Sequence, residues 1–226
     1  MRDWAPALVA EAIGTFLFFF IAAGSALVVT GDPAASLLVV ALAHGVVLAV
    51  LVSSLGAVSG GHFNPAVTLG LWVAGKIDAA KGLAYVVSQL VGAAAAGFGL
   101  AFLFTNVGPA VPALGQGVDA VEGIALEAVM TAVLLLAVFG TAVDSRAPKI
   151  GGLAIGLAVA ADILFGGSLT GGAMNPARWF GPAVAAGAFE NWYVWWIGPF
   201  LGAVAAALLY RYLFAPPADD SSGLQE

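Results

Sequence analysis

Two segments of this sequence carry the same polar tripeptide, Asn-Pro-Ala, in a similar setting. Residues 59 to 70 read SGGHFNPAVTLG and residues 170 to 181 read TGGAMNPARWFG, with six identities in twelve. Asn is a preferred N-cap residue and Pro suits the first position of a helix. We therefore predict that each tripeptide begins a helix, with the Asn side-chain oxygen engaged and its NH2 group free to donate to a water oxygen. The six residues are Asn64, Pro65, Ala66, Asn175, Pro176 and Ala177.

Such helix N-termini would repel cations as well as donate hydrogen bonds. Each N-terminus carries about +0.5 charge, worth on the order of 2 kcal/mol against a cation roughly 5 Å away at an effective dielectric of 20. Water held by two Asn donors would also turn its own hydrogens outward, which interrupts a proton-conducting chain. The alternative is that each tripeptide is only a capped turn. Two copies in register, each opening an apolar half-span, argue against it.

The remaining reactive residues are few. Arg178 lies within a membrane-depth segment, so it is a functional candidate, because a buried charge is expensive unless it faces a watery cavity. The sequence has no Cys and two His that are not close in sequence, so we expect no enzyme activity, no metal site and no cofactor. Asp162 and Trp179 receive no role from the sequence.

The composition places these residues in lipid. Hydrophobic residues make up 62% of 226 positions, charged residues 9%, and the mean hydropathy is +1.03. Six runs are long enough to cross a bilayer as helices, near residues 7 to 29, 36 to 56, 83 to 104, 121 to 142, 150 to 168 and 192 to 214. The predicted fold class is an all-α membrane protein with six transmembrane helices, two half-helices and an inverted two-fold repeat.

The repeat defines the domain organisation. We predict one transmembrane channel domain, with repeat 1 at about 7–104, repeat 2 at about 121–214 and a polar tail at 216–226. Because each repeat has three spans, the second must be inverted relative to the first, and the two loops enter from opposite faces. About 10 apolar residues after each Asn-Pro-Ala cover roughly 15 Å, half the hydrocarbon thickness. The two half-helices can therefore meet at the midplane.

The basic residues predict the orientation, because cytoplasmic loops retain positive charge. Two cytoplasmic termini place six of the seven basic residues inside, namely Arg2, Lys76, Lys81, Arg146, Lys149 and Arg211. We expect an integral protein of a prokaryotic inner membrane, without a cleaved signal peptide. Its net charge of −6 resides largely in the loops and tail, so we expect lipid and small solutes, not nucleic acid, as partners.

At these motifs the sequence resembles the aquaporin, or major intrinsic protein, family, from about Ala10 to Tyr212. The segments that carry the resemblance are AEAIGTF (10 to 16), GGHFNPAVTLG (60 to 70) and GGAMNPARWFGPA (171 to 183). The resemblance implies a homotetramer with one pore per subunit. It implies that Glu11 and Glu127 accept backbone hydrogen bonds from the pore loops. It also implies that loop carbonyls line the pore, those of Gly60, Gly61, His62, Gly171, Gly172 and Ala173.

Family members select solutes at an aromatic/arginine filter, whose positions can be counted from the motifs. They fall on His44, Ile163, Gly172 and Arg178. Water-specific members usually carry Phe and His at the first two positions, whereas this set resembles certain plant tonoplast intrinsic proteins associated with ammonia as well as water. Ile and Gly would widen the constriction, and His44 would supply a polar edge for water or ammonia.

The sequence therefore predicts a passive channel for water and small neutral solutes, including ammonia and hydrogen peroxide, that excludes protons and ions. One alternative is a glycerol or small-polyol facilitator, although the residues typical of glycerol channels after Asn-Pro-Ala-Arg are absent. A second is an ion-coupled secondary transporter, which would need ion-coordinating groups along its path. A non-conducting structural membrane protein is a third.

Overall fold

The computed structural model is all-helical and describes residues 4–148 and 150–215. Arg2, Lys149 and the predicted polar tail at 216–226 lie outside the described residues. The long helices are α1 (Ala5–Val28), α2 (Pro33–Ser59), α4 (Ala79–Leu103), α5 (Ala120–Val138), α6 (Leu153–Thr170) and α8 (Val194–Leu209). Two shorter helices are α3 (Pro65–Val73) and α7 (Pro176–Ala186). A 3-10 turn, η1, spans Gly108–Ala110, and two π-helical segments, η2 and η3, span Phe139–Val143 and Tyr210–Phe214.

The six predicted spans are confirmed to within a few residues. All six helices are long and apolar enough to cross a membrane, the fourth and sixth when η2 and η3 are counted with α5 and α8. The largest difference is at α2, which begins at Pro33 after an Asp32 N-cap and ends at Ser59 before the left-handed Gly60. Side-chain caps by Asp also begin α4 and α5. These caps satisfy the free N–H groups at the helix starts.

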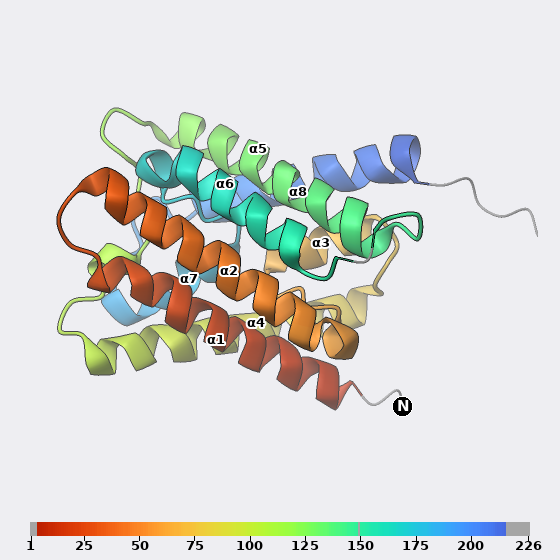
Figure 1. Cartoon of the computed structure of the whole chain (residues 1–226), viewed down its shortest axis with the longest axis horizontal. Helices are drawn as coiled ribbons and strands as arrows, with labels where there is room; N and C mark the ends of the chain where they lie inside the picture. The colour runs from red at the N-terminus through yellow and green to blue at the C-terminus, as the bar shows by residue number, and fades with distance from the viewer. Residues whose placement is uncertain (1–3, 149, 216–226) are drawn as a thin grey trace, which may run out of the picture.

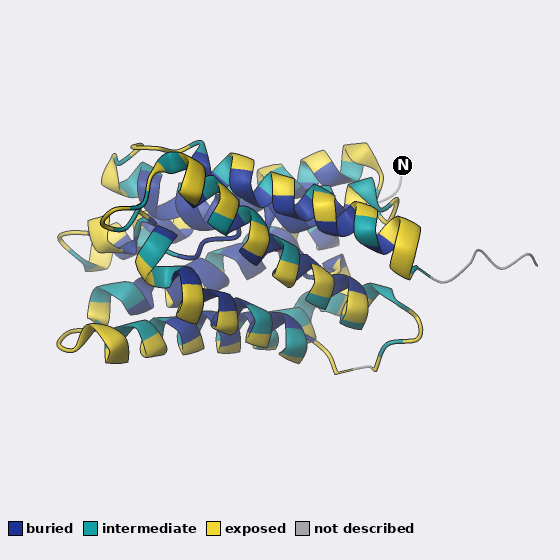
Figure 2. Cartoon of the chain, turned by 90° about the horizontal axis from the view of Figure 1, so that it is seen from above, coloured by how far each residue is buried: buried dark blue, intermediate teal, exposed yellow. Residues whose placement is uncertain are grey.

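The long helices run roughly along one axis of the molecule, and α3 and α7 lie among them in opposite halves (Figure 1). The principal neighbours are α5 with α8, α2 with α6, α1 with α4 and α4 with α7. Small residues allow the close crossings, since a Cβ on Gly156 would stand 2.2 Å from the carbonyl oxygen of Gly45. The interior elements are buried, while the outer helix faces alternate between buried and exposed residues (Figure 2).

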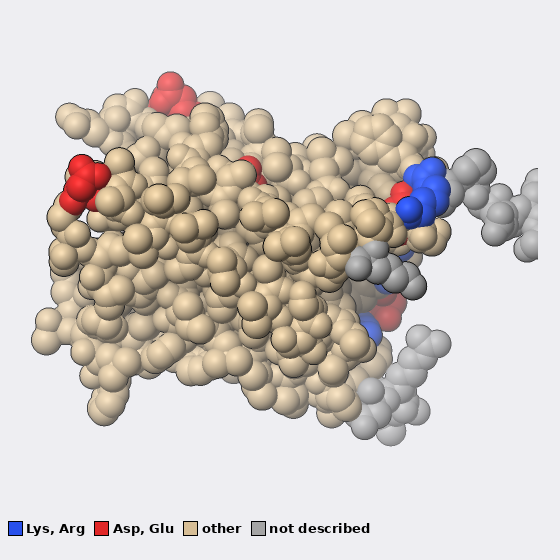
Figure 3. Space-filling view, in the orientation of Figure 1, with Lys and Arg blue, Asp and Glu red and all other residues tan. Residues whose placement is uncertain are grey.

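The ends of the described chain lie at the same end of the helix bundle (Figure 1). Basic side chains are visible at that end and acidic ones at both ends, with the helical belt between them largely uncharged (Figure 3). Two contacts of basic residues tie η3 to neighbouring segments, one to the end of α3 and one to the loop after η2. Arg211 on η3 donates to the carbonyl of Val73, and Arg146 donates to the carbonyl of Phe214.

Candidate pore

The two Asn-Pro-Ala segments meet inside the bundle. Asn64 and Asn175 cap α3 and α7, each accepting the backbone N–H two residues on, at 2.8 Å and 2.9 Å. The side-chain nitrogen of Asn64 donates to the carbonyl of Met174 at 3.0 Å, and that of Asn175 donates to Phe63 at 3.0 Å. The NH2 group of each Asn is therefore only partly free. One N–H of each Asn ties its half-helix to the opposite loop, and one remains to face a solute.

Glu11 supports the first loop. Its two carboxylate oxygens accept the backbone N–H groups of His62 (2.9 Å) and Phe63 (2.7 Å). They also accept the Ser59 hydroxyl and the Gln89 amide, both at 2.7 Å. The carboxyl is fully buried. Buried charge is tolerated when donors of this number surround it, so Glu11 holds the loop in the conformation that presents Asn64.

Glu127 supports the second loop in the same way. Its carboxylate accepts the backbone N–H groups of Ala173 (2.9 Å) and Met174 (2.6 Å), and the hydroxyl of Thr170 (2.6 Å). It is also fully buried. Phe63 and Met174 hold equivalent places in the two loops, and both have positive φ, 47° and 52°. Non-glycine residues rarely adopt that conformation, so the glutamate bonds stabilise strained turns.

The filter positions Arg178 and His44 are in direct contact. The Nε of Arg178 donates to Nε2 of His44 at 2.9 Å, and Nη1 donates to the carbonyl of Ala110 at 2.7 Å. Both side chains are buried, at 5% and 2% exposure. Arg178 is thus fixed from two sides, by α2 and by the turn at η1, which leaves its remaining N–H groups for the cavity.

The contacts of His44 assign its tautomer. Nδ1 lies 2.8 Å from the carbonyl of Val40, which can only accept, so Nδ1 carries the proton. Nε2 is then the acceptor for Arg178. The expectation that His44 offers a polar edge to solutes is therefore wrong, because both ring nitrogens are engaged within the protein. In this structure His44 orients Arg178, and its ring meets that of Phe18 edge-on at 6.2 Å.

One cavity joins these elements along the bundle. Most predicted pore residues line it, together with apolar side chains on the inner faces of α1, α2, α3, α5 and α6. The predicted residues that do so are His44, Gly60, Gly61, His62, Asn64, Gly172, Ala173, Asn175 and Arg178. Ile163 and Gly171 are not among the lining residues. Ile163 is 1% exposed and packs behind Gly172, whose Cβ would stand 3.2 Å from it. Gly171 ends α6 and faces Pro112 instead.

Sequence reasoning missed several residues that hold the pore loops. Ser59 and Thr170 occupy equivalent places in the repeat and bond to Glu11 and Glu127, and their shared hydroxyl was the available signal. Trp195 donates its ring N–H to the carbonyl of Thr170 at 2.9 Å. Trp179, which had no role, is buried and stacks on Trp195 at 5.9 Å, so it packs the wall behind the second loop.

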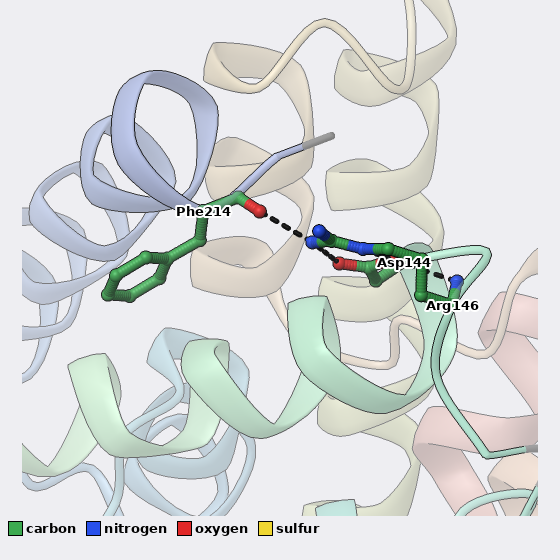
Figure 4. Close-up of polar contacts among 3 residues, drawn as sticks. All are labelled: Asp144, Arg146 and Phe214. Atoms are coloured by element: carbon green, nitrogen blue, oxygen red, sulfur yellow. Dashed lines mark hydrogen bonds and ion pairs between the residues drawn. The ribbon is translucent and has the colours of Figure 1, made fainter. Parts of the chain in front are cut away.

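An ion pair between Asp144 and Arg146 follows closely in sequence after the α5 end of the cavity. Val138 and Ala142 line this end, and Asp144 follows directly after η2. Arg146 binds Asp144 through two nitrogens, at 2.9 Å and 2.6 Å, and donates to the carbonyl of Phe214 at 2.6 Å (Figure 4). These bonds from Arg146 lower the pKa of Asp144 from 3.8 to about 2.

Comparison with known proteins agrees with this geometry. The sequence signature described as "Major intrinsic protein" matches residues 2–210. Aquaporin TIP4-4 of Zea mays is 47% identical over 217 residues, covering 92% of this chain and 86% of the relative. Aquaporin TIP2-1 of Arabidopsis thaliana is 42% identical over 217 residues, covering 92% and 87%. The X-ray structure of the aquaglyceroporin from Plasmodium falciparum shares the fold, with a TM-score of 0.81, 23% identity, and coverage of 93% of this chain and 97% of that one. The chain therefore belongs to the major intrinsic protein family, the family of the aquaporins.

Proposed function

We propose that this protein is a passive channel for water and small neutral solutes that excludes protons and ions. The observation that carries the proposal is the meeting of α3 and α7, in which each Asn caps its own half-helix and bonds to the opposite loop. Two positive helix ends facing one cavity repel cations, and the Asn N–H groups favour a solute that accepts hydrogen bonds. Relatives named as aquaporins support the same function.

Ammonia and hydrogen peroxide are the further solutes that we propose. The basis is the filter, in which Gly172 lines the cavity without a side chain and Ile163 stands behind it. This leaves Arg178 as the polar side chain that meets a solute there, because His44 is engaged. A filter that has a guanidinium on one side and no side chain on the other admits small neutral molecules other than water.

The alternatives are less well supported. An ion-coupled transporter needs carboxylates on its path, but no acidic side chain lines the cavity among the described residues. The oxygens of Glu11 and Glu127 already accept protein donors. A polyol facilitator remains the second candidate for the solute class. Enzyme activity has no support in a family whose matched relatives are aquaporins.

The assembly and membrane are also proposals. We propose a homotetramer with one pore per subunit, and a topology with both termini in the cytoplasm. The basic residues at the end where the described chain begins and finishes support that topology. The expected prokaryotic inner membrane gains no support from the comparisons, since the relatives described above are plant proteins. Native mass spectrometry of the purified protein tests the tetramer.

Osmotic shrinkage of proteoliposomes tests the channel directly. We expect water flux well above that of empty liposomes, with a low activation energy and no ionic current at an applied voltage. A panel of ammonia, hydrogen peroxide and glycerol then ranks the solutes. Water flux equal to that of empty liposomes, or flux that requires an ion gradient, would contradict the proposal.

A further inference from the structure

Asp162 is an acidic residue inside the membrane that the pore does not use. It lies on α6, within the fifth span, one residue before the filter position Ile163. It is 7% exposed, yet it is not among the residues that line the cavity. Acids at membrane depth are rare and usually paired, so an acid with no place in the pore needs its own explanation.

The carboxyl of Asp162 has no hydrogen-bond partner in the described part of the chain. Its Oδ2 atom is buried without any partner, and no hydrogen bond to Oδ1 is found among the described residues. Glu11 and Glu127, the other buried acids of the described spans, differ sharply, because backbone and side-chain donors surround them. An ionised carboxylate in such a place is strongly disfavoured, since nothing replaces its lost hydration.

The repeat shows what kind of side chain suits this position. The spacing of 111 residues that relates Asn64 to Asn175 places Leu51 opposite Asp162 in the first repeat. The two side chains are buried alike, at 8% and 7% exposure. Leu51 belongs to the apolar core. The equivalent position therefore accommodates an uncharged side chain of similar size.

The titratable groups on neighbouring helices do not serve as partners. Glu127 on α5 already accepts three donors, and its carboxylate has no proton to donate to an ionised Asp162. His44 on α2 has both nitrogens engaged with Val40 and Arg178. A neutral carboxylic acid, in contrast, can donate its O–H to the carbonyl one turn earlier. The hydroxyls of Ser88 on α4 and Thr141 on η2 make such bonds.

We propose that Asp162 is a neutral carboxylic acid within the membrane, and therefore a modification site for lipid-soluble carbodiimides. In the reaction, the carboxyl oxygen bonds to the central carbodiimide carbon and the acid proton moves to a carbodiimide nitrogen. The acyl group then migrates from oxygen to nitrogen and gives a stable N-acylurea. The whole reagent is retained, so no leaving group or oxidant is needed. A carboxylate lacks the proton for the first step.

The test uses the full-length protein in proteoliposomes at neutral pH with dicyclohexylcarbodiimide, followed by peptide mass spectrometry. We expect an adduct at Asp162 and none at Glu11 or Glu127, whose oxygens are occupied. Asp162→Asn should lose the adduct and keep the water permeability of the parent. A water-soluble carbodiimide should modify exposed acids such as Asp32 and Glu190 instead. An unmodified Asp162, or one modified equally by both reagents, would overturn the proposal.

A second variant keeps the proposal testable without the reagent. Asp162→Leu places the residue of the first repeat in the equivalent position, so we expect an unchanged or higher melting temperature. If Asp162 were ionised and paired, the same change would leave its partner buried and lower the melting temperature. A melting temperature below that of the parent would therefore also overturn the proposal.

Discussion

Glu127→Gln tests how far the carboxylate of Glu127 stabilises the second pore loop, because the substitution keeps the size of the side chain and removes its charge. The carboxylate receives three donors: the Thr170 hydroxyl and the Ala173 N–H on Oε1, and the Met174 N–H on Oε2. A Gln side chain offers one oxygen. If that oxygen takes the Oε1 place, its NH2 group confronts the N–H of Met174, a donor facing a donor.

The magnitude follows from these bonds. A buried N–H left without an acceptor costs about 1–3 kcal/mol, and weakening two charge-assisted bonds to neutral ones removes about 1 kcal/mol each. The sum is about 3–5 kcal/mol. For a domain of this size about 1 kcal/mol corresponds to about 2–4 °C, so a loss of 3 kcal/mol lowers the melting temperature by about 6–12 °C. Water permeability should fall as well, because the loop positions Asn175.

Two measurements on one preparation check this prediction. Thermal unfolding in detergent gives the melting temperature, and light scattering of proteoliposomes gives the water permeability per protein. Glu190→Gln is the matched control, since Glu190 lies exposed in the loop before α8. Glu11→Gln should reproduce the effect from the other repeat. Equal melting temperatures and permeabilities for Glu127→Gln and Glu190→Gln would refute the role assigned to the carboxylate.

Four further substitutions test the filter, the Asp144–Arg146 ion pair and the helix packing. Arg178→Val removes a charge worth about 3 kcal/mol against a cation about 5 Å away at an effective dielectric of 20, so cation permeability should rise about 100-fold; equal solute permeabilities would place Arg178 outside the pore. His44→Phe removes the acceptor that orients Arg178 and should change the ratio of ammonia flux to water flux; an unchanged ratio rejects that orienting role. The carboxyl of Asp144, whose pKa falls from 3.8 to about 2, stabilises the fold above about pH 4 and loses this effect as the pH falls to about 2. Asp144→Asn should therefore make the free energy of unfolding depend less on pH between about pH 4 and pH 2, which chemical denaturation at a series of pH values measures. Gly156→Ala would bring a Cβ within 2.2 Å of the facing backbone and should lower the melting temperature, whereas Gly140→Ala, with open space around it, should not.

The fold was largely predictable because its main determinants are local. Span length follows from the hydrocarbon thickness, and every predicted span appears as a helix within a few residues. The caps at Asn64 and Asn175 were also readable, since Asn-Pro marks a helix start by its own chemistry. The π-helical ends at 139–143 and 210–214 were not. They are packed together through the Phe139–Tyr210 stack at 4.6 Å, a contact between residues far apart in sequence.

The site was predictable in position but not in hydrogen bonding. Counting from the motifs placed His44 beside Arg178, yet it could not reveal that their bond occupies the free nitrogen of the imidazole. The same holds for Ala110, whose carbonyl reaches Arg178 from a loop with no recognisable motif. Ile163 shows a third limit. The sequence places Ile163 on an apolar, interior face of its helix, but only the fold shows that Gly172 lies between Ile163 and the cavity.

These bonds leave more free donors than free acceptors on four side chains that line the cavity, those of Arg178, His44, Asn64 and Asn175. A guanidinium has five N–H groups, of which Arg178 uses one on His44 and one on Ala110, so three remain. Asn64 and Asn175 each keep one N–H after bonding to the opposite loop. Their acceptor oxygens are occupied by the caps, and the acceptor nitrogen of His44 by Arg178. A cation therefore meets no free acceptor on the side chains of Arg178, His44, Asn64 or Asn175, while a neutral acceptor such as water or ammonia does meet donors on them. Selection against cations thus depends on the bond that removes the imidazole acceptor as well as on the charge of Arg178.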